Sequence, residues 1–428
     1  MLTPRLLPLA AFLLLLAATL VAGFFTGSLS SFVWWTSISA VICGAVVALA
    51  GTSRSGRGLA IALIILGAIV VRVALLPVPW DLSEDAARYH WDGKVLAAGI
   101  NPYLYPPNAV ELDSLRGDQL DGLISDRSER TLTVYPPLAE LVFAAGYLLT
   151  PGRLLGMQLL WLLAELAAWL ILARELAATN RPRQRLMLLA WAPLIVFTGY
   201  LPGHVDLLYL PFVAGFLVAV RRDRPVTAGL LLGLAVLVKP FPLLLLPAAV
   251  AEFGVRRSLG AIAALGGIVL VFYLPFLGAG WKLVSSMLLM AEEWSFNASL
   301  AAGLERLMPM TVAHIVSWSI FLLLIAATFR IRRDFLSRCL LACAAFAICT
   351  PTLFPWYLTF FLPLLALRPD PALLALTILA PLSDLILLGY LTTGTWHQPL
   401  WTGVLEYGVF YGLLIVGARN RWGMFRGG

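Results

Sequence analysis

Long apolar runs separated by short polar turns fill the sequence from one end to the other. Most runs reach or approach the ~20 residues that a helix needs to cross a bilayer. Backbone polar groups in lipid must be satisfied within their own segment, so we expect helices. The candidate spans lie at 6–26, 31–50, 59–78, 154–175, 186–199, 205–220, 226–252, 259–278, 311–328, 335–350, 355–367, 371–390 and 401–418. This pattern predicts an all-α polytopic membrane protein, with one multispanning domain over residues 1–428.

Two apolar stretches depart from the rule of one run for one span. The long run 226–252 is interrupted by Pro240 and Pro242. Because proline breaks a helix, we expect this run to cross twice as a broken hairpin. The stretch 137–150 is too short for a full span and is typical of a re-entrant or interfacial segment. With these assignments we expect about 12–14 transmembrane helices and both termini on one side.

Composition agrees with the apolar pattern. Hydrophobic residues make up 61% of the chain and charged residues 12%, whereas soluble proteins are about 45–50% apolar and about 25% charged. Mean hydropathy is +0.90. These values exclude a water-soluble globular fold and a disordered chain. The 4 cysteines lie in predicted spans and read as small apolar side chains, with no disulfide framework.

The net charge of +7 hides a strong asymmetry between the two faces. One set of short turns holds 20 of the 30 basic residues and only 5 of the 23 acids. Basic turns of membrane proteins face the cytoplasm. The acid-rich loops at 79–136 and 279–310 are therefore predicted to lie on the extracytoplasmic side, and the first of them is the longest non-membrane stretch.

The start of the 79–136 loop concentrates acidic residues. We predict that Ser83 caps a short helix and that four side chains share one face of it, at helical spacing: Asp85, Arg88, Tyr89 and Asp92. One interpretation is an amphipathic helix on the membrane surface with weak ion pairs, such as Glu84 with Arg88. The other is a reaction site, because clustered carboxylates suit general-base catalysis. The candidates for the base are Asp81, Glu84, Asp85 and Asp92.

Three further groups map to the same outer face. For the first group, His204 and Asp206, we predict a site carboxylate or a sugar-hydroxyl contact, and the alternative is a helix cap at Asp206. For the second group, Glu293 and Asn297, we predict sugar-hydroxyl contacts, and the alternative is a solvated loop. For the third group, Trp356 and Tyr357, we predict a pocket wall, and the alternative is an interfacial aromatic belt.

Two cations lie inside apolar runs, where charge is costly. Lys239 is in LAVLVKPFPLLLLP (234–247) and Arg72 is in GAIVVRVALLP (67–77). Each either extends toward the interface or serves as a counter-charge for a phosphate. The sequence has no GxxxxGK[ST] loop and no GxGxxG motif after a strand. An activated donor on the outer face would then arrive through the lipid, carrying phosphate.

Two blocks resemble a known superfamily: EDAARYHWDGKVLAAGINPYLYPP (84–107) and ISDRSERTLTVYPPLAELVFA (124–144). They are similar to the multispanning GT-C glycosyltransferases, and more narrowly to the bacterial polyprenyl-phosphate-mannose-dependent mannosyltransferases. The resemblance implies a GT-C-like bundle with short membrane-surface helices in the first large outer loop. It also implies an acidic general base in that loop. Asp85 best matches its position, with Asp81 and Asp92 as competitors. Phe354 stands where relatives often have a histidine.

The resemblance implies an inverting transfer of a single sugar, mannose by analogy, from a polyprenyl-phosphate donor to a hydroxyl of a lipid or glycan acceptor. We expect no metal, no cofactor and no nucleic-acid partner, and we place the active site on the extracytoplasmic side of a bacterial plasma membrane. Arg88, Tyr89 and Glu84 are expected to bind substrate. The alternatives are a transporter or flippase of lipid-linked sugars and a glycan ligase.

Overall fold

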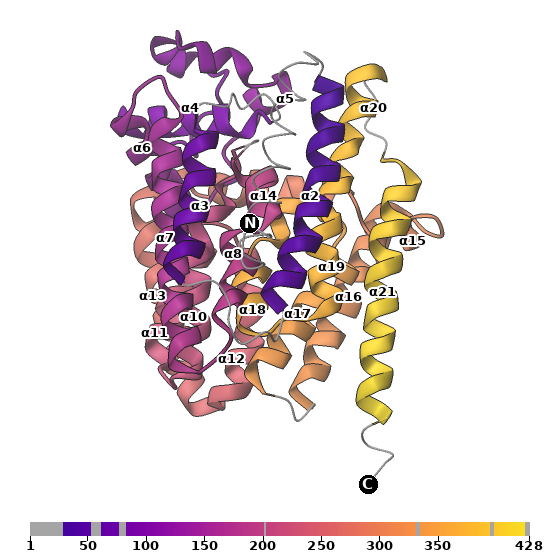
Figure 1. The fold of residues 1–428 in the computed structure, drawn as a ribbon. Coiled ribbons are helices and arrows are strands. Elements are labelled where there is room, and N and C mark those ends of the chain that lie inside the picture. The colour runs from indigo at the N-terminus through magenta and orange to yellow at the C-terminus, as the bar shows by residue number, and fades with distance from the viewer. Residues whose placement is uncertain are drawn as a thin grey trace.

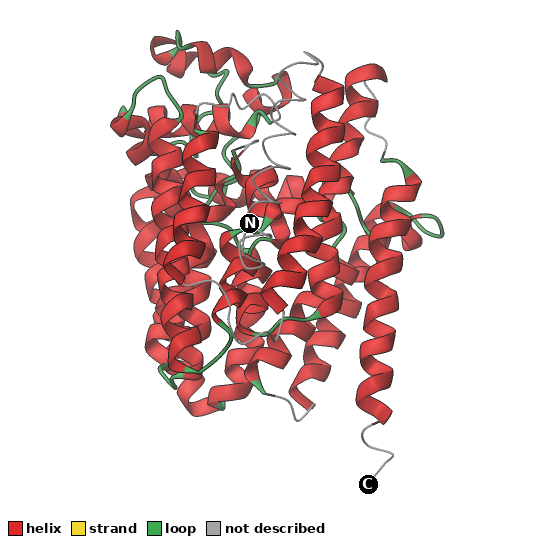
Figure 2. Cartoon of the chain, viewed as in Figure 1, coloured by secondary structure: helices red, strands yellow, loops and turns green. Residues whose placement is uncertain are grey.

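The computed structural model describes residues 29–52, 61–76, 83–200, 203–330, 334–393 and 398–423. This part of the chain is helical throughout, apart from one isolated β-bridge between Phe296 and Thr352 (Figure 2). Within these ranges, six helices are long and apolar enough to cross a membrane, and six further apolar segments are shorter. The prediction of an all-α polytopic membrane protein is confirmed. The predicted span 6–26 lies outside the described residues.

The α-helices are α2 (Leu29–Thr52), α3 (Ile61–Leu75), α4 (Asp85–Ala97), α5 (Asp126–Glu129), α6 (Pro137–Leu149), α7 (Leu155–Ala178), α8 (Met187–Ala190), α9 (Pro193–Ile195), α10 (Leu210–Arg221), α11 (Pro225–Val236), α12 (Leu246–Phe253), α13 (Val255–Tyr273), α14 (Lys282–Glu293), α15 (Leu300–Glu305), α16 (Met310–Arg330), α17 (Phe335–Cys349), α18 (Phe361–Leu367), α19 (Pro371–Leu379), α20 (Ile386–Thr393) and α21 (Leu400–Gly423). Short 3₁₀ or π turns join them: η1 (Val110–Leu115), η2 (Gln119–Leu123), η3 (Arg183–Leu186), η4 (Val196–Tyr200), η5 (Val205–Tyr209), η6 (Phe241–Leu245), η7 (Leu274–Ala279), η8 (Pro355–Leu358) and η9 (Ala380–Leu385).

The long helices run roughly side by side, and the elements of the first large loop gather at one end of the bundle (Figure 1). Helices α4 and α5 lie at this end, whereas the C-terminal end of α21 lies at the opposite end of the bundle. The acid-rich first loop and the C-terminal end of the last helix are therefore separated along the bundle. Which end faces the cytoplasm stays a prediction.

Proline interrupts two of the predicted spans. The run 226–252 divides into α11, η6 and α12, with the break at the Lys239–Pro240 step, as predicted. The carbonyl of Leu237 at this break accepts a hydrogen bond from the Ala139 amide of α6, at 3.3 Å. The predicted span 186–199 is not one helix, because Pro193 separates α8 from α9. Both breaks create irregular backbone inside the bundle, where side chains of other helices can reach it.

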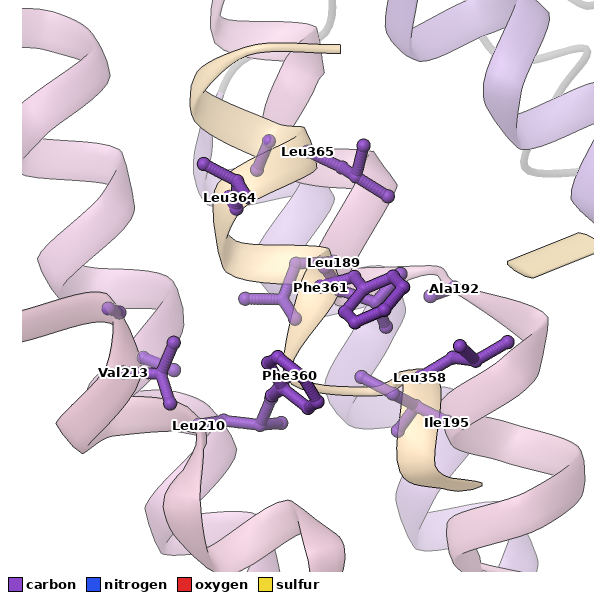
Figure 3. Packing of buried hydrophobic residues seen from close by; sticks show 14 of the residues in the cluster. Leu189, Ala192, Ile195, Leu210, Val213, Leu358, Phe360, Phe361, Leu364 and Leu365 are labelled. Atoms are coloured by element: carbon purple, nitrogen blue, oxygen red, sulfur yellow. The ribbon is translucent and has the colours of Figure 1, made fainter. Parts of the chain in front are cut away.

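Apolar side chains from these broken segments form the packing beneath the site. Figure 3 shows Phe360 and Phe361 between residues of α8, α9 and α10, among them Leu189, Ile195 and Leu210. All five side chains are buried. The turn η8 and the end of η5 border this cluster directly in sequence, so their polar side chains lie next to an apolar base.

Helix α4 is buried rather than lying open on the membrane surface. Residues Ala86 to Val95 are all buried, so the interpretation of an exposed amphipathic helix is wrong. The approach of α4 to α6 is close at Gly93, where an added Cβ would lie 2.3 Å from the Phe143 carbonyl oxygen. The predicted Ser83 cap is wrong, because the N-cap residue of α4 is Glu84 and no side chain caps the helix; Ser83 Oγ accepts a hydrogen bond from the Asp85 amide at 3.2 Å in the turn before it.

Candidate active site

Asp85 is the centre of a hydrogen-bonded cluster at the N-terminus of α4. Its Oδ2 lies 3.0 Å from Nδ1 of His204 and accepts a hydrogen bond from the Tyr89 hydroxyl at 3.3 Å. Oδ1 has no hydrogen-bond partner among the described residues. The side chain is 33% exposed. One carboxylate oxygen is therefore held by protein groups, and the other is available to a ligand.

His204 brings the second element to this cluster. Gly203, just before it, has a φ of 81°, in the left-handed region that favours glycine, and the chain turns there into η5. The imidazole is 1% exposed and stacks on Trp356, with ring centroids 3.6 Å apart. Its Nδ1 faces Asp85, and its buried Nε2 has no hydrogen-bond partner among the described residues. Stacking and the Asp85 contact together fix the ring.

A row of aromatic rings continues from His204. Trp356 stacks on Phe354, with centroids 4.5 Å apart, and Phe354 stacks on Phe296 at the same distance. Phe296 is placed by the β-bridge to Thr352, which joins the second outer loop to the turn before η8. A pocket opens on this row, and its polar lining is Thr36, Ser37, Ser83, His204 and Asp384. Aromatic walls with a few polar groups are typical of ligand sites.

A buried ion pair lies next to the Asp85 cluster. Lys239 Nζ donates to Asp206 Oδ2 at 2.6 Å, and both side chains are at most 10% exposed. The Tyr209 hydroxyl donates to Asp206 Oδ1 at 3.2 Å, and the ammonium lies 5.3 Å from the Tyr357 ring centroid. Asp206 is therefore not a helix cap, and Lys239 points into the protein rather than toward the interface.

The charges around Asp85 set its protonation. Burial raises the pKa of the carboxyl, but the hydrogen bond and charge of His204 lower it, and Lys239 and Tyr89 add to this effect. The net result is a pKa below the ordinary value of an aspartate. Asp85 is therefore a carboxylate at neutral pH, the state in which it can accept a proton.

Three predicted site residues, Glu84 just before α4 and Arg88 and Asp92 within it, contact the outer loop or each other and do not line the pocket. Glu84 accepts hydrogen bonds from the Ser125 amide at 2.7 Å and from Ser128 Oγ at 3.1 Å. Arg88 pairs with both oxygens of Asp92 at 2.9 Å and donates to the Ser128 carbonyl at 2.8 Å. With its oxygens on Arg88 and 2% exposure, Asp92 is not available to a substrate.

The remaining predicted residues lie apart from Asp85 or outside the described part. The side chains of Arg72 and Glu165 are fully buried, and Arg72 Nη2 lies 2.8 Å from Glu165 Oε1. Arg72 is therefore part of a core ion pair. Asn297 donates to Glu406 Oε2 at 3.0 Å and is buried. Asp81 and the side chain of Glu293 lie outside the described residues.

Sequence reasoning missed the roles of two tyrosines. The Tyr135 hydroxyl donates to the Tyr89 hydroxyl at 3.2 Å, so it supports the group that holds Asp85. Tyr209 connects Asp206 to Thr359. The VYPP turn at 134–137 was a visible signal for Tyr135. Tyr209 gave no such signal, because it lies in an apolar run.

The profile of one known family matches the chain over residues 133–354, more than half of its length: glycosyltransferase family 87. The chain belongs to glycosyltransferase family 87. Comparison with curated proteins and with solved structures gave no significant match. The predicted recognition is confirmed, since this family holds GT-C type membrane glycosyltransferases, among them polyprenyl-phosphate-mannose-dependent mannosyltransferases. Membership implies transferase activity, and the apolar helices make this family 87 chain an integral membrane protein.

The matched range and the Asp85 cluster overlap only in part. His204, Asp206, Lys239 and Tyr135 lie within residues 133–354. Asp85 lies before that range, and it is joined to it by the contacts of His204 and of Tyr89 with Tyr135. The folded chain of this family 87 member therefore brings its first loop and its matched region together at one carboxylate.

Proposed function

We propose that this chain transfers a single sugar, mannose, from a polyprenyl-phosphate donor to a hydroxyl of a lipid or glycan acceptor on the extracytoplasmic face. Family membership supports glycosyl transfer. The charge asymmetry of the turns supports the outward-facing site, and the resemblance supports the donor. The observation that carries the proposal is the Asp85 carboxylate, which His204 holds on one oxygen, whose other oxygen has no partner among the described residues, and which lies beside an aromatic pocket.

In the proposed reaction Asp85 is the general base. The acceptor oxygen attacks the anomeric carbon as Asp85 Oδ1 takes the hydroxyl proton. The bond from the anomeric carbon to the phosphate oxygen breaks, and polyprenyl phosphate leaves with that electron pair. A single displacement inverts the anomeric configuration. Phosphate is a good leaving group, so the step needs one base and no acid.

His204 and Tyr89 position the base. Both contact Oδ2, which directs the lone pairs of Oδ1 away from the protein. Stacking on Trp356 fixes the imidazole plane. Such a chain of supporting contacts holds a reacting group within the narrow geometric range that transfer requires.

Lys239 is the predicted cation that lies in this cluster, and we assign it the phosphate side of the reaction. Its present partner is Asp206, so it acts on the donor as one member of a Lys239–Asp206 pair. Arg72 does not share this role, because Glu165 engages its guanidinium. Developing negative charge on the leaving phosphate is stabilised by a positioned cation.

Two other functions remain as alternatives. A flippase of lipid-linked sugars would use ionisable groups within the bilayer, and the described part of the chain pairs Arg72 with Glu165 inside the bundle. A glycan ligase would share the outer loops. Family membership favours the transferase over the flippase.

The test uses purified protein with radiolabelled polyprenyl-phosphate-mannose and a panel of lipid and glycan acceptors. We expect a labelled product whose new linkage has the configuration opposite to that of the donor. Parallel reactions with a nucleotide-activated mannose and with a preassembled lipid-linked oligosaccharide separate the alternatives. Transfer from either of those donors, without transfer from the lipid monophosphate, would contradict the proposal.

A further inference from the structure

A second cluster of polar side chains lies on α4, apart from the residues that surround Asp85. His90 comes from α4, Asp118 precedes η2, and Asp121 lies within η2. One ring nitrogen of His90 and one oxygen from each carboxylate all lie within 4.8 Å of one another. These three residues connect α4, which also carries Asp85, to the η2 segment of the first large loop.

The state of His90 points to a missing partner. The side chain is 0% exposed, and neither Nδ1 nor Nε2 has a hydrogen-bond partner among the described residues. Oδ1 of Asp121 is buried and unpartnered as well. A buried polar group left without a partner costs about 1–3 kcal/mol, and native proteins satisfy nearly all of them. Here unpartnered groups from two elements meet at one place.

Lys94 occupies only one side of the cluster. Its Nζ lies 2.8 Å from Asp118 Oδ2 and 3.3 Å from Asp121 Oδ2. Oδ2 of Asp121 also accepts hydrogen bonds from the amides of Gly117 and Asp118. The ammonium therefore balances one of two negative charges and leaves both ring nitrogens of His90 without a hydrogen-bond partner among the described residues. A divalent cation between the imidazole and the carboxylates would satisfy the groups that Lys94 does not reach.

The ligand types select the cation. One imidazole nitrogen with two carboxylate oxygens suits Zn²⁺, which binds both at about 2.0–2.2 Å. Two ligands of a tetrahedral Zn²⁺ at these distances lie about 3.4 Å apart, so the observed spread of up to 4.8 Å requires the side chains to close by up to about 1.4 Å on binding. Ca²⁺ takes oxygen ligands and would leave His90 unsatisfied. We propose that His90, Asp118 and Asp121 form a structural Zn²⁺ site that fastens η2 to α4.

This site would act on stability and not on the transfer step. It lies on the same helix as Asp85, but it shares no residue with the pocket. Lys94 would compete with the metal for the same carboxylates, so its removal should affect metal binding. A role of His90 in packing alone predicts no such effect. Removal of this lysine should strengthen metal binding, although it removes two ion pairs.

The test measures Zn²⁺ binding to the full-length protein, purified with a histidine-free tag and stripped with a chelator. We expect one Zn²⁺ per chain by titration calorimetry and by metal analysis after dialysis, and a rise in thermal midpoint that Ca²⁺ does not cause. His90→Gln should weaken Zn²⁺ binding by more than about tenfold, since even outer-shell changes cost that much. Lys94→Gln should tighten it by roughly tenfold, because a nearby like charge is removed.

Asp113→Asn is the matched control, since this exposed carboxylate of η1 pairs only with Arg116 among the described residues. It should bind Zn²⁺ as the wild type does. Each variant is first checked for a monodisperse profile and for its metal-free thermal midpoint. Absence of Zn²⁺ binding by the wild type would overturn the proposal. So would binding that His90→Gln leaves unchanged, because the metal would then lie elsewhere.

Discussion

The buried pair of Lys239 and Asp206 allows a quantitative test of the site's electrostatics. Nζ and Oδ2 are 2.6 Å apart, and a pair at that distance attracts by about 6 kcal/mol at an effective dielectric constant of about 20. Desolvation offsets much of this, at several kcal/mol for each ion. The net contribution of the pair to stability is therefore modest. If one partner is removed, however, the other is left as an uncompensated buried charge.

We expect Lys239→Gln to destabilise the protein by about 3–5 kcal/mol, the usual cost of breaking a buried pair. Asp206→Asn should do the same, and the double variant should lose much less than the sum of the two. The assay is reversible unfolding in mixed micelles of increasing SDS fraction, run as a double-mutant cycle. Additive losses would refute the reasoning, because they would mean that the two charges do not depend on each other.

Two further predictions concern the placement and the protonation of the base. Gly93→Ala should destabilise the protein by about 1–3 kcal/mol or more and lower activity, because the new Cβ would meet the Phe143 backbone at 2.3 Å. Gly122→Ala is its control, since nothing lies within 4 Å of that Cβ, and equal losses in thermal midpoint would contradict the close approach. His204→Asn should move the acid limb of the kcat/KM profile to higher pH, because His204 lowers the pKa of Asp85. Because the pKa of Asp85 is depressed, the carboxylate stays charged at pH values below the ordinary aspartate pKa, and the charge is lost only as the pH falls through the depressed pKa. An unshifted acid limb would show that His204 does not act on the base.

Much of the fold followed from hydrophobic pattern alone. The helical class, the break at Pro240 and the short segment 137–150 were all readable, since each depends on local sequence and on what lipid permits. The division of 186–199 at Pro193 was missed, although Pro193 gave the same signal as the prolines that predicted the break in 226–252. The burial of α4 was missed as well, because its charged residues satisfy one another and the loop rather than water.

The site was only partly predictable, because its contacts span long separations in sequence. Asp85 and His204 are 119 residues apart, and nothing in their local sequences pairs them. Likewise, the sequence does not show that His204, just before η5, joins the aromatic row of Phe354 and Trp356 by stacking on Trp356. Arg72 and Lys239 looked alike as lone cations in apolar runs. Only their partners, Glu165 and Asp206, distinguish a core ion pair from a member of the site.

The most direct test of the central claim is the transfer rate of Asp85→Asn with labelled polyprenyl-phosphate-mannose. The substitution keeps the size of the side chain and removes the base, and general-base catalysis contributes about 100-fold to 10,000-fold. We predict a loss of kcat in that range with an unchanged thermal profile, while Glu111→Gln, an exposed control in the same loop, keeps wild-type activity. A rate for Asp85→Asn within a few-fold of wild type would contradict the account.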